Sequence, residues 1–100
     1  MSRFGPKSLG DDPQVPNLDA MDPEELWALW AKWRYIKRAD AVALVGPRKG
    51  YTVLVGKLAG YASNKATAMN CRIRGDIPAA LVYESICESI YSELPEDCRW

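Results

Sequence analysis

The chain has 100 residues, of which 48% are hydrophobic and 26% are charged, and its net charge is zero. This composition fits one globular domain with a modest core. Histidine is absent, which removes the commonest general base and metal ligand and argues against most zinc sites and histidine-dependent hydrolysis. No apolar run approaches the roughly 18 residues that cross a bilayer, and residues 1–12 lack the apolar segment of a secretory signal. We therefore expect no membrane partner.

The number and spacing of the cysteines bear on whether the protein is in a reducing or an oxidising compartment. The chain has 3 of them, Cys71, Cys87 and Cys98, and none forms a C-x-x-C pair. An odd number argues against a disulfide framework. We therefore expect reduced thiols and a cytoplasmic location.

Charge is segregated along the chain although the total is zero. Residues 1–31 hold two basic and six acidic side chains, a net charge of −4. Residues 32–74 hold ten basic side chains against Asp40 alone, a net charge of +9, and residues 75–100 hold one basic and six acidic side chains, a net charge of −5. A basic middle between acidic ends either pairs internally or presents cations to a partner such as phosphate.

Residues 1–20 contain three prolines and two glycines and few large apolar side chains, which predicts a flexible N-terminal arm before a helical domain at 21–100. The first helix begins sharply, because Asp22 suits the N-cap, Pro23 the first helical position and Glu25 the capping-box position. Its predicted core stripe shares an arc of about 120° at ~100° per residue: Leu26, Leu29, Trp30, Trp33 and Ile36.

Trp27 lies on a neighbouring stripe with Arg34 and Arg38. Two interpretations stay open at this point. The arginine stems can cover the tryptophan, or the three side chains can form an exposed aromatic and basic contact surface.

Residues 39–55 have two interpretations. Apolar runs at 41–45 and 51–55 flank Gly46-Pro47-Arg48-Lys49-Gly50. If the two runs are strands, residues 41–55 form a short β-hairpin. Read as helix, the first helix continues to about residue 45 and the Gly-Pro pair turns into a second helix. We adopt the helical interpretation, because an isolated two-stranded hairpin is marginally stable.

The second helix, about residues 50–74, carries a stripe of small residues opposite its apolar side: Gly56, Gly60, Ser63 and Thr67. Each mid-helix glycine costs roughly 1 kcal/mol relative to alanine, so two at this spacing suggest the close approach of another backbone. The approaching element is either another helix of the domain or a partner, including a second copy in a homo-oligomer.

Gly75 and Asp76 predict a helical hairpin, since glycine suits the left-handed position that ends a helix and aspartate caps the next one. The third helix then runs from about 76 to 94 and stops at Pro95. The fold we predict is all-α, a three-helix bundle at about 22–45, 50–74 and 76–94.

Residues 64–95 resemble a single tetratricopeptide repeat. Ala68, Ala80 and Cys87 match small positions of that family, and Gly75-Asp76 matches its turn. Asn64, Thr67, Cys71 and Glu84 depart from it at positions where the family has large or aromatic residues. The resemblance implies a protein-interaction scaffold, with the first helix supplying the layer that one repeat lacks.

No motif in the sequence identifies a reaction. Residues 50–58 suggest a phosphate-binding loop, but Leu58 stands where serine or threonine must hold Mg²⁺. We expect no catalytic residue, no metal site and no cofactor, and hence not an enzyme. The predicted function is a small binding module for another protein, with nucleic-acid binding through residues 32–74 as the alternative.

The candidate binding residues are Trp27, Arg34, Arg38, Arg48, Lys49 and Arg74. If Lys65 and Arg72 pair with acids of the third helix, part of the basic charge is structural. If the candidate cations form an open patch, phosphate binding is favoured.

Overall fold

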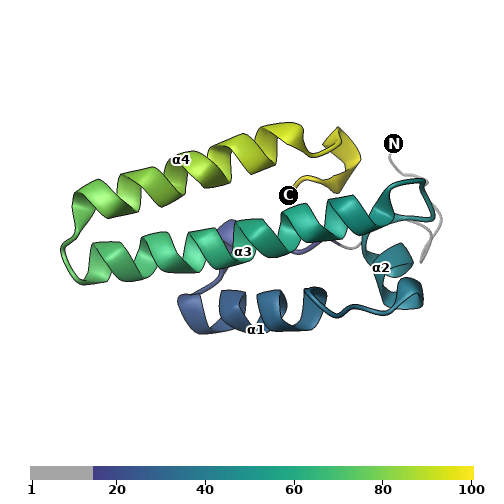
Figure 1. Cartoon of the computed structure of the whole chain (residues 1–100), viewed down its shortest axis with the longest axis horizontal. Coiled ribbons are helices and arrows are strands. Elements are labelled where there is room, and N and C mark those ends of the chain that lie inside the picture. Colours follow the sequence, from purple (N-terminus) through teal and green to yellow (C-terminus); the bar gives the residue numbers. More distant parts are fainter. Residues whose placement is uncertain (1–14) are drawn as a thin grey trace.

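The computed structural model describes residues 15–100, which form four α-helices and two short 3₁₀ helices. In chain order these are η1 (Leu18–Ala20), α1 (Pro23–Trp33), α2 (Arg38–Val45), α3 (Tyr51–Ile73), α4 (Ile77–Glu93) and η2 (Glu96–Cys98). The long helix α3 lies in the middle, with α1 along one side, α4 along the other and α2 near its N-terminal end (Figure 1). The all-α prediction is confirmed, and residues 41–55 form helix rather than the alternative β-hairpin.

The predicted three-helix bundle is wrong in one respect, because the first predicted helix, 22–45, is broken in two. Helix α1 ends at Trp33, and α2 begins at Arg38 after an extended Lys37 with φ −77° and ψ 153°. Neither glycine nor proline stands at the break. The break lets α2 turn and bury Ala41, Leu44 and Val45, so tertiary packing overrides local helix propensity here.

The predicted helix starts are confirmed in detail. Asp22 Oδ1 accepts a hydrogen bond from the Glu25 N–H at 2.9 Å, and Glu25 Oε1 accepts one from the Asp22 N–H at 3.0 Å. These two bonds form the predicted capping box around Pro23. In the α3–α4 turn Gly75 has φ 83°, and Asp76 accepts a hydrogen bond from the Ala79 N–H at 3.2 Å. The helical hairpin is therefore present at the predicted turn.

The core forms where α1, α2 and α4 meet α3. Helix α3 contributes Val55 and Leu58 together with a run of small side chains, Ala59, Ala62 and Ala66, which let neighbouring helices approach closely. Of the predicted α1 stripe, Leu26 and Trp33 are buried, whereas Leu29, Trp30 and Ile36 are half-buried and pack against the core.

The predicted arm needs a correction at its C-terminal end. Leu18 is 0% exposed, and Val15 packs against the core. The Tyr61 hydroxyl donates to Asp19 Oδ1 at 2.6 Å, which fixes η1 on α3. Residues 15–20 therefore belong to the folded domain, and the remainder of the predicted arm, residues 1–14, lies outside the described residues.

Candidate binding groove

Four of the basic side chains in the middle of the chain pair with carboxylates. Lys65 Nζ lies 3.5 Å from Asp19 Oδ1 in η1, and Arg72 donates to Glu84 Oε1 of α4 at 2.9 Å. Two more pairs join α3 and its neighbours to the C-terminal part of the chain: Lys57 with Glu93, and Arg48 with Asp97. Four of the ten basic side chains in residues 32–74 therefore pair within the fold.

Two of these pairs lower the pKa of their carboxyl group. The hydrogen bond from Arg72 lowers the pKa of Glu84 below its ordinary value. The hydrogen bonds from Arg48 lower the pKa of Asp97 in the same way. Both shifts favour the ionised carboxylate, as expected beside a guanidinium.

The remaining cations are not paired in this way. Among the described residues, no carboxylate lies within ion-pair distance of Lys32, Arg34, Lys37, Arg38, Lys49, Arg74 or Arg99. Three of them, Arg34, Arg38 and Lys49, line adjoining hollows beside the first turn of α3.

The larger hollow lies between the α1–α2 connection and α3 and has a volume of about 310 Å³. Apolar side chains of Trp33, Ile36 and Val55 line it, and Arg34 and Arg38 stand at its side. Its remaining lining residues are Ala41, Tyr51, Thr52 and Gly56. A methyl group at Gly56 would meet no atom within 4 Å, so the hollow is open beside that residue.

The smaller hollow continues from the first around the α2–α3 turn. It has a volume of about 210 Å³, and its lining includes Pro47, Arg48 and Lys49. Arg38 and Tyr51 line both hollows, and the Arg38 guanidinium lies 5.8 Å from the centre of the Tyr51 ring. We call the two hollows together the basic groove.

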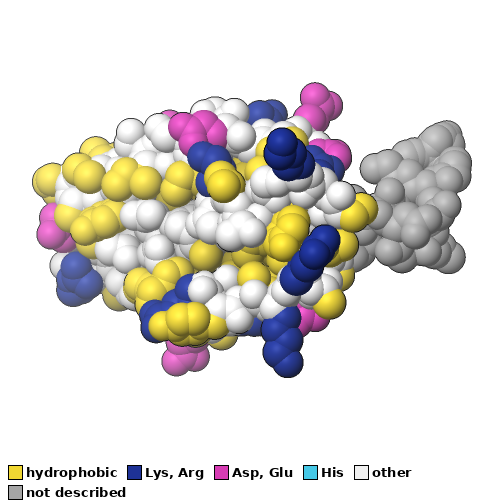
Figure 2. Space-filling model, turned by 45° about the vertical axis from the view of Figure 1, so that its right-hand side comes forward, with side chains coloured by type: hydrophobic (Ala, Val, Ile, Leu, Met, Phe, Trp, Pro, Cys, Tyr) yellow, Lys and Arg dark blue, Asp and Glu magenta, His cyan; other side chains and the backbone are white. Residues whose placement is uncertain are grey.

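The electrostatic character of this end of the molecule is visible on its surface. Figure 2 turns the α2 end forward and shows Lys and Arg side chains around exposed hydrophobic ones. Such a surface offers fixed positive charge beside apolar area, which suits an anionic ligand with an aromatic or aliphatic part.

Aromatic rings on α1 and just after it lie close to Arg34, which lines the groove. The Arg34 guanidinium lies 4.3 Å from the centre of the Trp30 ring and 4.7 Å from that of Tyr35, and it donates to the Tyr35 hydroxyl at 2.9 Å. Trp27 meets Trp30 edge to face, with ring centres 5.6 Å apart. Trp27 is 37% exposed and Tyr35 is 77% exposed.

This arrangement corrects the predicted stripe of Trp27, Arg34 and Arg38. Arg34 stacks on Trp30 rather than covering Trp27. Because α1 ends before Arg38, that arginine leaves the stripe and stands over Tyr51 of α3 instead.

Four of the six predicted binding residues line the groove, namely Arg34, Arg38, Arg48 and Lys49. Trp27 lies farther along α1. Arg74 caps the opposite end of α3, about 34 Å away at 1.5 Å per residue, and takes no part in the groove. Tyr51 also lines the groove, and no sequence pattern indicates this, because it depends on where α2 places Arg38.

The small-residue stripe on α3 serves more than one purpose. A methyl group at Gly60 would lie 3.7 Å from Ile90 Cδ1 of α4, so this glycine lies where the two helices pack. The Ser63 hydroxyl donates to the Gly60 carbonyl at 3.1 Å, and the Thr67 hydroxyl donates to the Ser63 carbonyl at 2.8 Å. Gly56, by contrast, lies at the groove.

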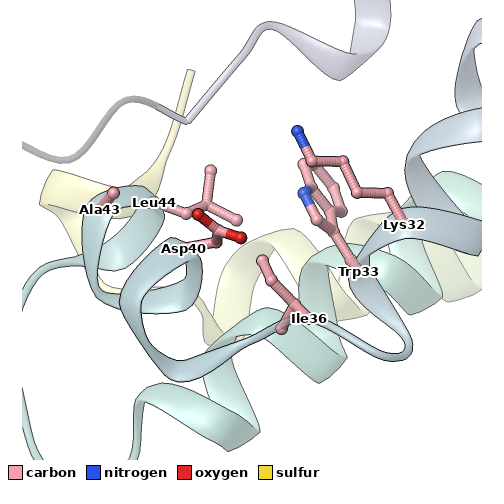
Figure 3. Close-up of a pocket in the computed structure, with 6 residues that line it drawn as sticks. All are labelled: Lys32, Trp33, Ile36, Asp40, Ala43 and Leu44. Carbon is pink, nitrogen blue, oxygen red and sulfur yellow. The ribbon is translucent and has the colours of Figure 1, made fainter.

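A separate cleft of about 280 Å³ lies on the other side of Trp33 and Ile36, between α1 and α2. Figure 3 shows Trp33, Ile36 and Leu44 around this space, with Lys32 and Asp40 at its sides. Trp33 and Ile36 line both the cleft and the basic groove. This cleft exists only where the predicted long helix breaks, so no sequence pattern indicates it.

Comparison of the chain with protein-family models, curated proteins and solved structures gave no match. The tetratricopeptide resemblance of residues 64–95 therefore stays a prediction. Among the described helices, none is long and apolar enough to cross a membrane. Within residues 15–100, no group of three or more His, Cys, Asp or Glu side chains is placed to hold a metal ion.

Proposed function

We propose that the protein is a small non-enzymatic binding module that takes an acidic segment of another protein in the basic groove. The supporting observation is that Arg34, Arg38 and Lys49 stand around one groove without a carboxylate partner among the described residues. Arginine guanidinium groups bind carboxylates in a bidentate geometry. The apolar lining from Trp33 and Ile36 offers an anchoring surface for a hydrophobic side chain of the same segment.

Charge favours a protein partner over a nucleic acid. The chain carries no net charge, and internal ion pairs occupy Arg48, Lys57, Lys65 and Arg72. A long polyanion gains most of its affinity from many phosphate contacts, and the three cations of the groove that lack a carboxylate partner among the described residues offer little of that gain. The 3 cysteines are buried free thiols, which supports the proposed cytoplasmic location.

Nucleic-acid binding is the second candidate, and one observation favours it. Tyr35 is exposed beside Arg34 just after α1, and Trp27 is exposed on α1 against Trp30. Exposed aromatic rings beside cations are the usual platform for stacking unpaired bases, each worth about 1–3 kcal/mol.

Fluorescence anisotropy with two labelled probes separates the candidates. One probe is a peptide of alternating glutamate and phenylalanine, and the other is a single-stranded oligothymidylate of similar length. We expect the peptide to bind more tightly at physiological salt. If the oligonucleotide binds more tightly and its affinity falls steeply with salt, the second candidate replaces the first.

The matched variants are Arg38→Glu and Arg74→Glu. Both arginines lack a carboxylate partner among the described residues, and both substitutions change the charge equally, but only Arg38 lines the groove. We expect Arg38→Glu to weaken peptide binding at least tenfold and Arg74→Glu to leave it within about twofold, because only groove contacts are lost. Equal losses in the two variants, with unchanged melting temperatures, would place the contact outside the groove.

A further inference from the structure

The outer face of α4 carries large apolar side chains that the fold does not cover. Ile77 is 41% exposed, Leu81 55%, Val82 59% and Ile86 39%. Just before the helix, Ile73 is 75% exposed. Figure 2 shows hydrophobic side chains in a row along the upper left of the molecule, the side on which α4 begins.

The opposite side of α4 already packs on α3 through Ala80 and Cys87, which are 0% and 3% exposed. Helix α4 is therefore apolar on two sides, although the described part of the chain covers only one. A helix of this kind packs against a second element. The small Ser85, in the middle of the exposed face, lets another helix approach closely.

The charges at the two ends of this face indicate which kind of partner packs on it. Arg74 lies just before α4, and Glu88 lies one turn beyond Ser85, and neither has an ion-pair partner among the described residues. A cation at one end of an apolar face and an anion at the other make the face complementary to itself in an antiparallel arrangement. Two-fold symmetric pairing uses self-complementarity of this kind.

We propose that two copies of the protein pair through their α4 helices in an antiparallel, two-fold symmetric contact centred between Leu81 and Val82. Leu81 of each copy then lies beside Val82 of the other. The N-terminal Ile77 of one helix lies at the axial level of Ile86 of its mate. These two residues are nine positions apart and so face opposite sides of the helix, at the two edges of the contact.

The same register brings the unpaired charges together. Glu88 is seven residues beyond Leu81, which is about 10 Å along a helix. In the antiparallel pair this position is level with residue 75 of the second copy, next to its Arg74. Each dimer therefore gains two equivalent Arg74–Glu88 contacts at the rim of the apolar centre.

Sedimentation equilibrium of the full chain from roughly 1 µM to 1 mM tests the proposal, a range that covers weak dimers. We expect a monomer–dimer equilibrium. Val82→Glu should abolish it, because each copy would bury a carboxylate at the centre of the contact. Val53→Glu is the matched control, because Val53 is a valine of similar exposure, 62%, near the other end of α3, and this variant should dimerise as the unmodified chain does.

Charge reversal provides a test that does not depend on the apolar centre. Arg74→Glu and Glu88→Arg should each weaken dimerisation about tenfold, since each places like charges together, and the double variant should restore it. Circular dichroism confirms that each variant folds. A chain that stays monomeric over the whole range overturns the proposal, whether residues 1–14 or a different protein covers the face. Dimerisation that survives Val82→Glu, or a double variant no better than the single ones, overturns it too.

Discussion

The Trp100 indole N–H donates a hydrogen bond to Asp19 Oδ2 at 3.0 Å and joins residues 81 positions apart in the chain. The other oxygen of Asp19 accepts from the Tyr61 hydroxyl at 2.6 Å. The Trp100 ring packs edge to face on both Tyr61 and Tyr91, with ring centres 4.7 Å apart in each pair. The Tyr91 hydroxyl donates to the Trp100 carbonyl at 2.6 Å. We call this cluster, with Lys65 at its edge, the aromatic clasp.

The indole hydrogen bond should contribute measurably to stability. Trp100→Phe keeps an aromatic ring in the clasp but removes the donor to Asp19. We expect the free energy of unfolding to fall by about 1 kcal/mol from the lost hydrogen bond, with a further loss from the smaller ring. Urea denaturation followed by circular dichroism measures the change.

Trp27→Phe is the control for this substitution, because the Trp27 ring lies on α1, is 37% exposed and packs edge to face on Trp30 rather than in the clasp. It should change the free energy of unfolding by less than about 0.5 kcal/mol, as a partly exposed site does. Equal effects of the two substitutions would mean that the indole hydrogen bond contributes nothing.

Acid should weaken the clasp. Partial burial acts to raise the pKa of Asp19, but hydrogen bonds from Tyr61 and Trp100 and the charge of Lys65 outweigh it, and the net pKa is lowered. A carboxyl group with a lowered folded-state pKa stabilises the fold above its unfolded pKa, near 4, and loses that contribution as the pH falls through the folded value. We expect the melting temperature to fall between about pH 5 and pH 2.

Asp19→Asn should make this fall shallower, because the variant has no carboxylate to protonate at the clasp. The pairs of Glu84 and Asp97 also weaken in acid, since their pKa values are lowered in the same direction, so part of the fall remains. Asp40→Asn, at an acid without an ion-pair partner among the described residues, should leave the profile nearly unchanged. A profile that is equally steep with and without the Asp19 carboxylate contradicts the assignment.

The tryptophans of α1 should differ in their contributions to stability. Trp33 is 5% exposed, Trp30 is half-buried under Arg34, and Trp27 is 37% exposed. Trp33→Ala should cost roughly 3–5 kcal/mol through the cavity it leaves, Trp30→Ala less, and Trp27→Ala least. Chemical denaturation of the three variants gives the order, and a Trp30 variant less stable than the Trp33 variant would contradict it.

Local signals predicted the all-α class and the helix ends, but not the break between α1 and α2, which depends on long-range packing. The capping box of Asp22 and Glu25 and the turn at Gly75 depend on neighbouring residues alone, so the sequence reveals them. The break after Trp33 has no such signal, because it depends on α2 packing against α3. The groove forms at that break, and for this reason the sequence identified its cations but not their meeting with Tyr51.

The tryptophan assignments show a second limit of the sequence. A helical wheel divides residues into faces, but it gives no measure of how far a neighbouring element covers each face. Trp30 and Trp33 share the predicted core arc, yet only Trp33 is buried. The exposure of the outer face of α4 could not be predicted for the same reason, since apolar residues on a helix suit a core as well as a contact surface.

The place of α3 between α1 and α4 (Figure 1) also determines how the molecule opens. Either outer helix can detach while α3 stays packed on the other, so the outer helices can exchange amide hydrogens through local openings. The middle of α3 loses protection only when both have left. Its amides should therefore exchange most slowly, at the rate of global unfolding, and substitutions on α1 and on α4 should change stability additively because they act on opposite sides of the same helix.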